Sequence, residues 1–199
     1  LLKLLTYEEK IGGISIFDSR VEMLILEFKE KEGILSISTS SFVDLPVGVI
    51  AGGVLKNEEA FVAAISELIK KNKVSKKSKV SSFVVSIPAN FIYFHSFSFP
   101  RNLSDQQIEE AMKLNLRFSL PLSQDAVYVD WETVQSQDTA KKEVVLCSAP
   151  KNYIDQYLTA LSKAGVTTVA LEFHALSISR VLALEPDSSA MIAIFSNND

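Results

Sequence analysis

Residues 11–21 read IGGISIFDSRV, and this stretch decides how the rest of the chain folds. β-Branched and aromatic residues flank a polar Asp-Ser-Arg turn, a pattern that predicts strands at 13–17 and 21–28 joined by a tight turn. A further polar turn leads to a third predicted strand at 34–42. The chain is therefore predicted to open with three strands in succession.

Beyond these strands, helix signals alternate with strand signals. Asn57 can cap a helix that runs to about residue 71. Ser104 and Gln107 form a capping box at the start of a second helix that ends near residue 118. The other predicted elements are strands 80–88, 90–99, 127–134 and 143–149, helix 152–164 ending on Gly165, strand 167–173, helix 175–184 and strand 190–195. This order indicates an α/β or α+β chain with an insertion in its middle.

The composition limits the possible functions. The 199 residues carry a formal net charge of −4, which suits one sizeable domain or two small ones and argues against a nucleic-acid binder. Cys147 is the single cysteine, so we expect a buried structural thiol in a reducing cytoplasm. No run reaches the roughly 18–20 apolar residues of a membrane span, and the opening LLKLL is too short for a signal peptide. The chain lacks an initiating Met and stops after an apolar run, so we expect a fragment.

Four groups of residues, taken in order, resemble the PilM family of type IV pilus assembly proteins, with a weaker similarity to the cell-division protein FtsA. Each motif is weak alone, but together they cover nearly the whole chain in a specific order and spacing. The groups are 11–21 at the family's opening strands, 83–88 with 99–104, 118–122 with 127–131, and 164–166 leading to 171–176 and Arg180.

The resemblance implies a fold class and a division into parts. The expected fold is an α/β actin-like (ribonuclease H-like) first lobe that carries an inserted α+β subdomain of the FtsA/PilM type. The expected parts are a base subdomain at 1–90, the inserted subdomain at 91–165, a return to the base at 166–189 and the start of a truncated second lobe at 190–199.

The resemblance also directs attention to the nucleotide site. In actin-like ATPases, two Asp-x-Gly turns face each other; the aspartate organises magnesium, and the glycine lets backbone N–H groups approach the phosphates. Here Ser15 and Phe17 stand at the first turn, and Ala193 and Phe195 at the second. Because both turns lack both residues, we expect a pseudo-ATPase with no catalytic residue, no metal and no ATP cofactor. Asp18 could supply a displaced carboxylate, although a turn former is the simpler interpretation.

Other polar side chains have simpler explanations than catalysis. His95 on a predicted strand and His174 at a predicted helix start lack an accompanying serine nucleophile motif. Glu172 precedes the same helix, where a negative charge is favourable. Asp130 and Glu132 lie on the outward face of an alternating strand, which is typical of solvated charge.

The PilM resemblance finally implies a partner. PilM-like proteins capture the N-terminal tail of the bitopic inner-membrane protein PilN, which requires apolar pockets for an extended peptide. The candidate pocket residues are Phe97, Phe99, Phe118 and Trp131, although most aromatic side chains of so small a subdomain must form its core. We therefore expect a cytoplasmic scaffold of a pilus, competence or secretion platform, peripheral to the inner membrane through its partners. The alternatives are an ATP-binding actin-like ATPase that uses displaced residues and a GspL-like cytoplasmic domain of type II secretion.

Overall fold

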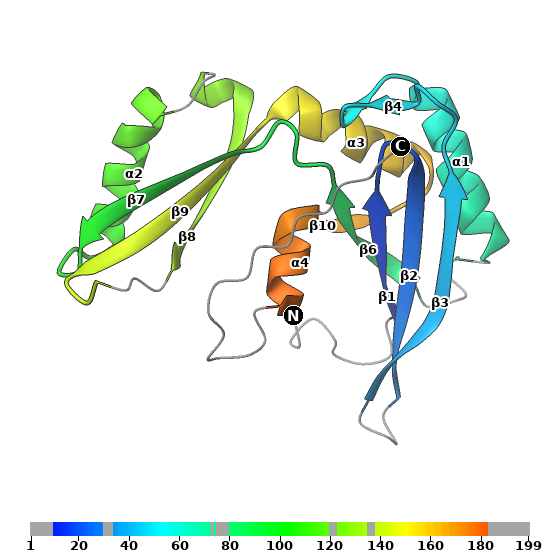
Figure 1. Cartoon of the computed structure of the whole chain (residues 1–199), viewed down its shortest axis with the longest axis horizontal. Coiled ribbons are helices and arrows are strands. Elements are labelled where there is room, and N and C mark those ends of the chain that lie inside the picture. Colours follow the sequence, from blue (N-terminus) through cyan, green and yellow to red (C-terminus); the bar gives the residue numbers. More distant parts are fainter. Residues whose placement is uncertain are drawn as a thin grey trace.

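The computed structural model describes residues 10–29, 34–72, 74, 80–119, 123–134 and 138–182. Two sheets lie at opposite ends of the chain's long axis, each with its own helices (Figure 1). The elements are β1 (Lys10–Ile16), β2 (Arg20–Lys29), β3 (Ile34–Asp44), β4 (Ile50–Ala51), β5 (Val54–Leu55), α1 (Glu58–Lys71), β6 (Val80–Ile87), β7 (Tyr93–Pro100), α2 (Asp105–Ser119), the 3-10 turn Gln124–Ala126, β8 (Val127–Val134), β9 (Lys141–Pro150), α3 (Lys151–Lys163), β10 (Thr168–Phe173) and α4 (His174–Leu182).

The predicted helices and strands are confirmed throughout the described residues, with small shifts at their ends. Asn57 caps α1 as expected, since its side chain accepts a hydrogen bond from the Ala60 N–H at 3.0 Å. The short hairpin β4–β5 is absent from the predicted elements, because two-residue strands are too short to give a periodic signal. The predicted strand 190–195, which contains Ala193 and Phe195, lies outside the described residues.

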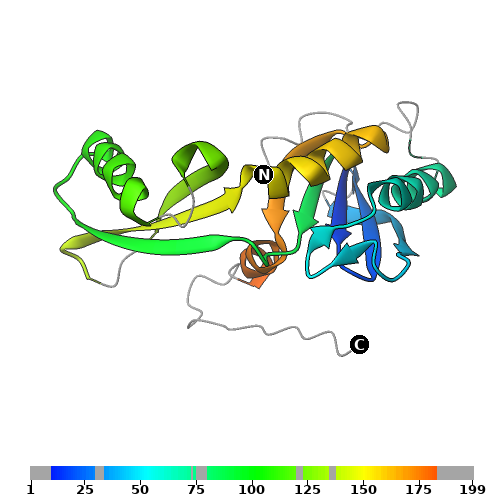
Figure 2. The same ribbon diagram turned by 90° about the horizontal axis from the view of Figure 1, so that it is seen from above.

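The larger unit is a five-stranded sheet in the order β10-β6-β1-β2-β3. β1, β6 and β10 run parallel, whereas β2 and β3 are antiparallel additions to β1. One face, the core face, packs against α1 and α3, and α4 lies on the other, the open face (Figure 2). The largest fully buried side chains between α1, α3 and the sheet include Phe61, Ile65, Tyr157, Ile14 and Ile87.

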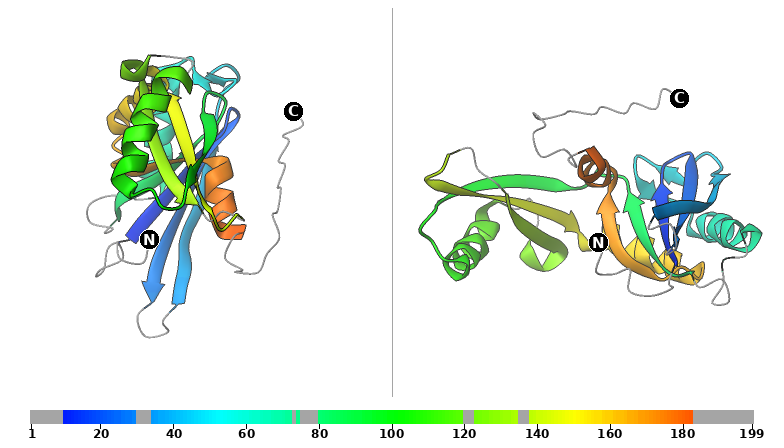
Figure 3. Two further views of the ribbon diagram at one scale, coloured as in Figure 1. Left: turned by 90° about the vertical axis from the view of Figure 1, so that its left-hand side faces the viewer. Right: turned by 90° about the horizontal axis from the view of Figure 1, so that it is seen from below.

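The smaller unit is a three-stranded antiparallel sheet in the order β7-β9-β8, and α2 covers one of its faces (Figure 3). Its core consists of Ile108 and Met112 from α2 with Val144 and Leu146 from β9. The alternation predicted for β8 is confirmed, because its inward side chains are the buried or half-buried ones and Asp130 is exposed.

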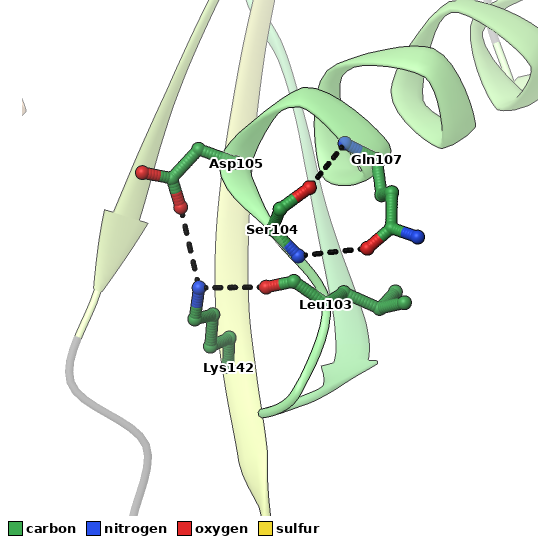
Figure 4. Close-up of polar contacts among 5 residues, drawn as sticks. All are labelled: Leu103, Ser104, Asp105, Gln107 and Lys142. Atoms are coloured by element: carbon green, nitrogen blue, oxygen red, sulfur yellow. Dashed lines mark hydrogen bonds and ion pairs between the residues drawn. The ribbon is translucent and has the colours of Figure 1, made fainter.

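A complete capping box starts α2 (Figure 4). The Ser104 N–H donates to Gln107 Oε1 at 2.9 Å, and the Gln107 N–H donates to Ser104 Oγ at 3.3 Å. Lys142 of β9 donates from Nζ to the Leu103 carbonyl at 2.9 Å and pairs with Asp105 at 3.2 Å. The cap therefore fixes the helix start locally and also ties it to the sheet beneath.

One expected grouping needs correction. The predicted insertion 91–165 includes helix α3, but the buried side chains of α3, among them Tyr153, Tyr157 and Leu161, belong to the core of the five-stranded unit. The reason is that α2 already covers the inner face of the small sheet, whereas α3 packs beside α1 on the large one.

Within the described part of the chain, we find no helix with the length and apolar character needed to cross a membrane.

Candidate functional site

The carboxyl ends of the parallel strands meet beside the β1–β2 turn, where α/β sheets commonly place their ligands. The register pairs Ser15 with Glu22 on one side and Ser86 on the other, and it pairs Ser86 with Glu172. Directly paired residues project from the same face of a sheet. A polar row of two hydroxyls between two carboxylates therefore crosses the open face at this edge.

Phe17 lies next to this row, in the turn where a phosphate-cradling glycine would be needed. Its N–H donates to the Arg20 carbonyl at 2.9 Å and closes the turn. Its ring stacks on His174 of α4, with 4.5 Å between the ring centroids and 25° between the ring planes. The aromatic ring and the start of α4 thus occupy the space beside the first turn.

Asp18 has a structural partner that the sequence does not reveal. Its two carboxylate oxygens accept hydrogen bonds from the backbone N–H groups of Gly52 at 2.7 Å and Gly53 at 3.0 Å. These glycines form the β4–β5 turn and have φ values of +57° and +75°, which L side chains rarely adopt. Asp18 therefore joins two turns 34 residues apart, in addition to its place in its own turn.

Two buried tyrosines extend this connection into the core. The Tyr157 hydroxyl donates to the Gly53 carbonyl at 2.7 Å, and the Tyr153 hydroxyl donates to the Pro88 carbonyl at 2.7 Å. Burial, together with the negative charge of Asp18, raises the pKa of Tyr153 to about 12. Burial also raises the pKa of Tyr157, with added contributions from the neighbouring Tyr153 and from Asp18. Asp18, the β4–β5 turn and α3 thus form one hydrogen-bonded assembly behind the first turn.

His174 is a titratable group that contacts the polar row, through the Ser86 backbone. Burial lowers its pKa, opposed by a hydrogen bond to the Ser86 backbone and by the charge of Glu22. Its Nε2 atom and the Ser86 hydroxyl are buried without a hydrogen-bond partner among the described residues. Glu172, near the end of β10, accepts a hydrogen bond from the hydroxyl of Ser177 in α4 at 3.0 Å.

The aromatic residues predicted to line a groove lie mainly in the small core. Phe97, Phe99 and Trp131 are half-buried and pack against its α2–β9 cluster. The Phe118 side chain, on α2, lies outside the described residues. His95 is exposed, and its ring lies 4.5 Å from that of Phe97. The register places Phe97, Phe99 and Trp131 on the α2 side of the sheet, which the helix covers.

Another group of aromatic side chains is exposed instead, where the small sheet meets α3. We call it the aromatic junction, and it consists of Phe91, Tyr93, Phe94 and Tyr128. The Tyr128 hydroxyl donates to Asp155 Oδ1 at 3.0 Å, Lys151 Nζ lies 5.6 Å from the Tyr128 ring centroid, and the Phe91 ring contacts Tyr153. Sequence reasoning counted these aromatics toward the core. They lie at strand ends, next to the Pro150 that leads into α3, and this position is the signal that distinguishes them from the core aromatics.

Cys147 lies on the sheet face away from α2, between Phe94 and Asp130 in the strand register. It is half-buried rather than fully buried as predicted, and it packs at the margin of the large core. Burial and the charge of Asp130 raise its pKa to about 11, so the thiol stays protonated at neutral pH.

Comparison with known proteins identifies the family. The family model for the type IV pilus assembly protein PilM matches residues 13–196. A chain from a structure described as a PilM–PilN type IV pilus biogenesis complex superposes with a TM-score of 0.71 at 18% identity, over 89% of this chain and 52% of that chain. A Ppx/GppA phosphatase from Aquifex aeolicus gives a TM-score of 0.38 at 13% identity, over 84% of this chain and 36% of that one, a likeness too low to support an argument.

The present chain spans about half the length of the chain that it matches in that complex. The similarity establishes an actin-like α/β fold with an inserted α+β unit, as the sequence resemblance implied. With the family model covering nearly all of its residues, this chain belongs to the PilM family of type IV pilus assembly proteins.

Proposed function

We propose that this chain is part of a scaffold in a type IV pilus assembly platform, that it binds the N-terminal tail of a PilN-like membrane protein, and that it hydrolyses no ATP. The observation that carries the proposal is the family match over residues 13–196. The shared fold with a chain described in complex with PilN supports the choice of partner. In this role the chain is cytoplasmic and reaches the inner membrane through that partner.

The aromatic junction supports the binding role. Extended peptides dock through backbone hydrogen bonds and apolar side chains seated in pockets, and exposed aromatic residues dominate the affinity of such contacts. Phe94 and Tyr128 are about half exposed at this junction, and Lys151 and Asp155 add charged groups beside Tyr128. The predicted groove residues Phe97, Phe99 and Trp131 lie in the adjoining small core, where they support the surface from behind.

Peptide binding tests this role directly. The N-terminal peptide of the PilN-like protein, carrying a fluorescent label, should bind the chain in an anisotropy titration, and a scrambled peptide should not. Phe94→Ala and Tyr128→Ala should each weaken binding by about tenfold or more, as expected for aromatic hot spots. Val169→Ala, at an exposed apolar position on β10, is the matched control and should change affinity little. Absence of binding at millimolar peptide, or equal weakening by all three variants, would remove the support for this partner.

The arrangement at the first turn supports a scaffold without turnover. Phe17 stands beside the turn, both oxygens of Asp18 already accept backbone hydrogen bonds, and Ser15 replaces the carboxylate of an ATPase. A ligand at 100 times its Kd would stabilise the folded state by about 2.7 kcal/mol, which a thermal shift detects readily. We expect no shift with millimolar ATP and magnesium, for this chain and for the full-length protein. A saturable, magnesium-dependent shift would instead favour the ATPase alternative.

A further inference from the structure

β3 forms the outer edge of the five-stranded sheet. Its strand partner among the described residues is β2 alone. The N-terminal part of β3 and the paired C-terminal part of β2 extend past the first residue of β1 (Figure 1). An edge strand presents a row of backbone N–H and C=O groups that can pair with another extended strand. What can pair there depends on the side chains and on the charge of the edge.

This edge lacks most of the features that protect edge strands from pairing. β3 is 11 residues long, about twice the usual strand length, and it reads ILSISTSSFVD. From Ile34 to Val43 it contains no charged residue and no proline. Four apolar side chains on it are well exposed: Ile34 at 50%, Leu35 at 49%, Ile37 at 65% and Phe42 at 54%. Its protective features are an irregularity at Ser38, where the register with β2 shifts, and helix α1, which lies beside part of the strand.

The irregularity at Ser38 decides which residues share the open face. Before it, Leu35 and Ile37 pair with Phe28 and Leu26 of β2. After it, Ser40 and Phe42 pair with Leu24 and Glu22. Because Glu22, Leu24 and Leu26 alternate along β2 on the open face, their β3 partners Phe42, Ser40 and Ile37 lie on that face, and Leu35 shares it two residues before Ile37. The open-face positions are therefore odd-numbered before Ser38 and even-numbered after it.

This change of parity makes β3 complementary to itself. In an antiparallel pair of two β3 strands related by a two-fold axis between Ser38 and Thr39, open-face residues meet open-face residues. Leu35 then lies opposite Phe42 of the second copy, and Ile37 lies opposite Ser40. On the core face, Ile34 lies opposite Val43. Apolar cross-strand pairs of this kind stabilise sheets, and this register places no like charges opposite each other within residues 34–43.

We propose that β3 is a self-association edge. The β3 strands of two copies pair antiparallel, so that the two five-stranded sheets become one continuous sheet. A second copy is favoured over a charged peptide because the edge has no charge with which to attract one. A two-fold contact of this type uses the same surface on both copies and closes without forming a fibre. The pairing is independent of the aromatic junction, which lies in the other unit, so it stands apart from the proposed peptide binding.

Sedimentation velocity of the 199-residue chain tests the proposal at concentrations from about 1 µM to several hundred µM, the range expected for a contact smaller than roughly 800 Å² per partner. We expect a monomer–dimer equilibrium. Ile37→Lys should weaken it by about tenfold or more, because an edge lysine blocks strand pairing. Val47→Lys is the matched control, since Val47 is a fully exposed apolar residue outside β3, and it should leave the equilibrium unchanged.

Disulfide trapping tests the register. In a Cys147→Ser background, the double variant Ile37→Cys/Ser40→Cys should form a covalent dimer, because directly opposed residues have Cα atoms about 4.5–5.5 Å apart, within disulfide range. Each single variant should remain unlinked, since neither residue faces its own copy in this register. A monomer at all concentrations, equal weakening by Ile37→Lys and Val47→Lys, or equal trapping of single and double variants would overturn the proposal. So would a full-length protein that stays monomeric while the 199-residue chain pairs, because the edge would then be covered by the rest of the chain.

Discussion

The two units of the molecule differ in how they are stabilised. The five-stranded unit packs one whole sheet face against α1 and α3, and its buried set extends from Ile14 to Phe173. The core of the three-stranded unit, within the described residues, centres on Ile108, Met112, Val144 and Leu146 under a single helix. Because hydrophobic stabilisation scales with the apolar area removed from water, the small unit must depend more on local hydrogen bonds and on its attachment to the large one.

Because of this difference, surface residues and core residues are separated to different degrees in the two units. In the small unit, the half-buried Phe97 and Trp131 pack against the core, whereas Phe94 and Tyr128 on the same strands are exposed. In the large unit, the core lies between the sheet and the helices α1 and α3, whereas β3 exposes apolar side chains at the edge of the sheet. Substitutions in the two units should therefore differ both in size and in how far their effects spread.

The largest expected effect is in the large core. Phe61→Ala removes a ring with no solvent exposure that packs edge-on to Tyr157, so it should lower the free energy of unfolding by about 3–5 kcal/mol. Urea denaturation followed by circular dichroism measures this loss. Both units should lose stability together, since the small unit is attached through α3. A loss below about 1 kcal/mol would contradict the assignment of Phe61 to the main core.

The corresponding substitution in the small core should act locally. Leu146→Ala, at a residue 1% exposed, should cost about 2–4 kcal/mol within that unit. Hydrogen exchange should then speed up in β7, β8, β9 and α2 while β1 and β6 keep their protection. Uniform acceleration over both sheets would indicate that the chain unfolds as one cooperative body and would remove the contrast between the units.

A smaller effect should follow from Tyr157→Phe, which leaves the Gly53 carbonyl without its buried donor. The expected loss is about 1–3 kcal/mol in urea denaturation. Tyr128→Phe removes a hydroxyl from an exposed hydrogen bond and is the matched control, with little change expected.

The raised pKa values of Tyr153 and Tyr157 also predict how stability depends on pH. The neutral forms of both side chains favour the folded state, so the free energy of unfolding should fall as the pH rises above the ordinary tyrosine value of 10.0. The loss should be smaller in Tyr157→Phe than in the wild type.

The capping box gives a still smaller effect in the other unit. Ser104→Ala removes the acceptor of the Gln107 N–H and should cost about 1 kcal/mol, read out as faster exchange in the first turn of α2. Ser123→Ala is a suitable control, because Ser123 precedes a 3-10 turn without making a side-chain cap. Equal effects of the two substitutions would mean that the capping box contributes nothing beyond a surface serine.

The smallest effect concerns pH in the neutral range. Burial lowers the pKa of His174, so the neutral ring favours the folded state and its contribution is fully present above the ordinary value of 6.5. That contribution is lost as the pH falls through the lowered pKa. The groups that face it are Glu22, which opposes the shift, and the Phe17 ring. Urea midpoints at pH 7.5 and 5 should differ less in His174→Gln than in the wild type, whereas the exposed His95→Gln should keep the wild-type difference.

Much of the fold could be predicted from the sequence. Strand alternation, the Asn57 cap and the Ser104–Gln107 capping box are properties of short segments, and each was found where the pattern indicated. The site was harder, because its geometry depends on residues far apart in the chain. The Phe17–His174 stack and the bridge from Asp18 to Gly52 and Gly53 join positions that give no local signal of their contact.

The sequence by itself therefore determined the order of the elements, the family and the presence of Ser15 and Phe17 where the resemblance places an Asp-x-Gly turn, because these depend on local pattern and residue type. The tertiary structure alone decided that α3 joins the large core and which aromatics are exposed. It also explains Gly12: a side chain there would place its Cβ 2.2 Å from the Phe83 ring on the neighbouring strand. Contacts of this kind arise when the sheet brings distant strands side by side, and no window of sequence contains both partners.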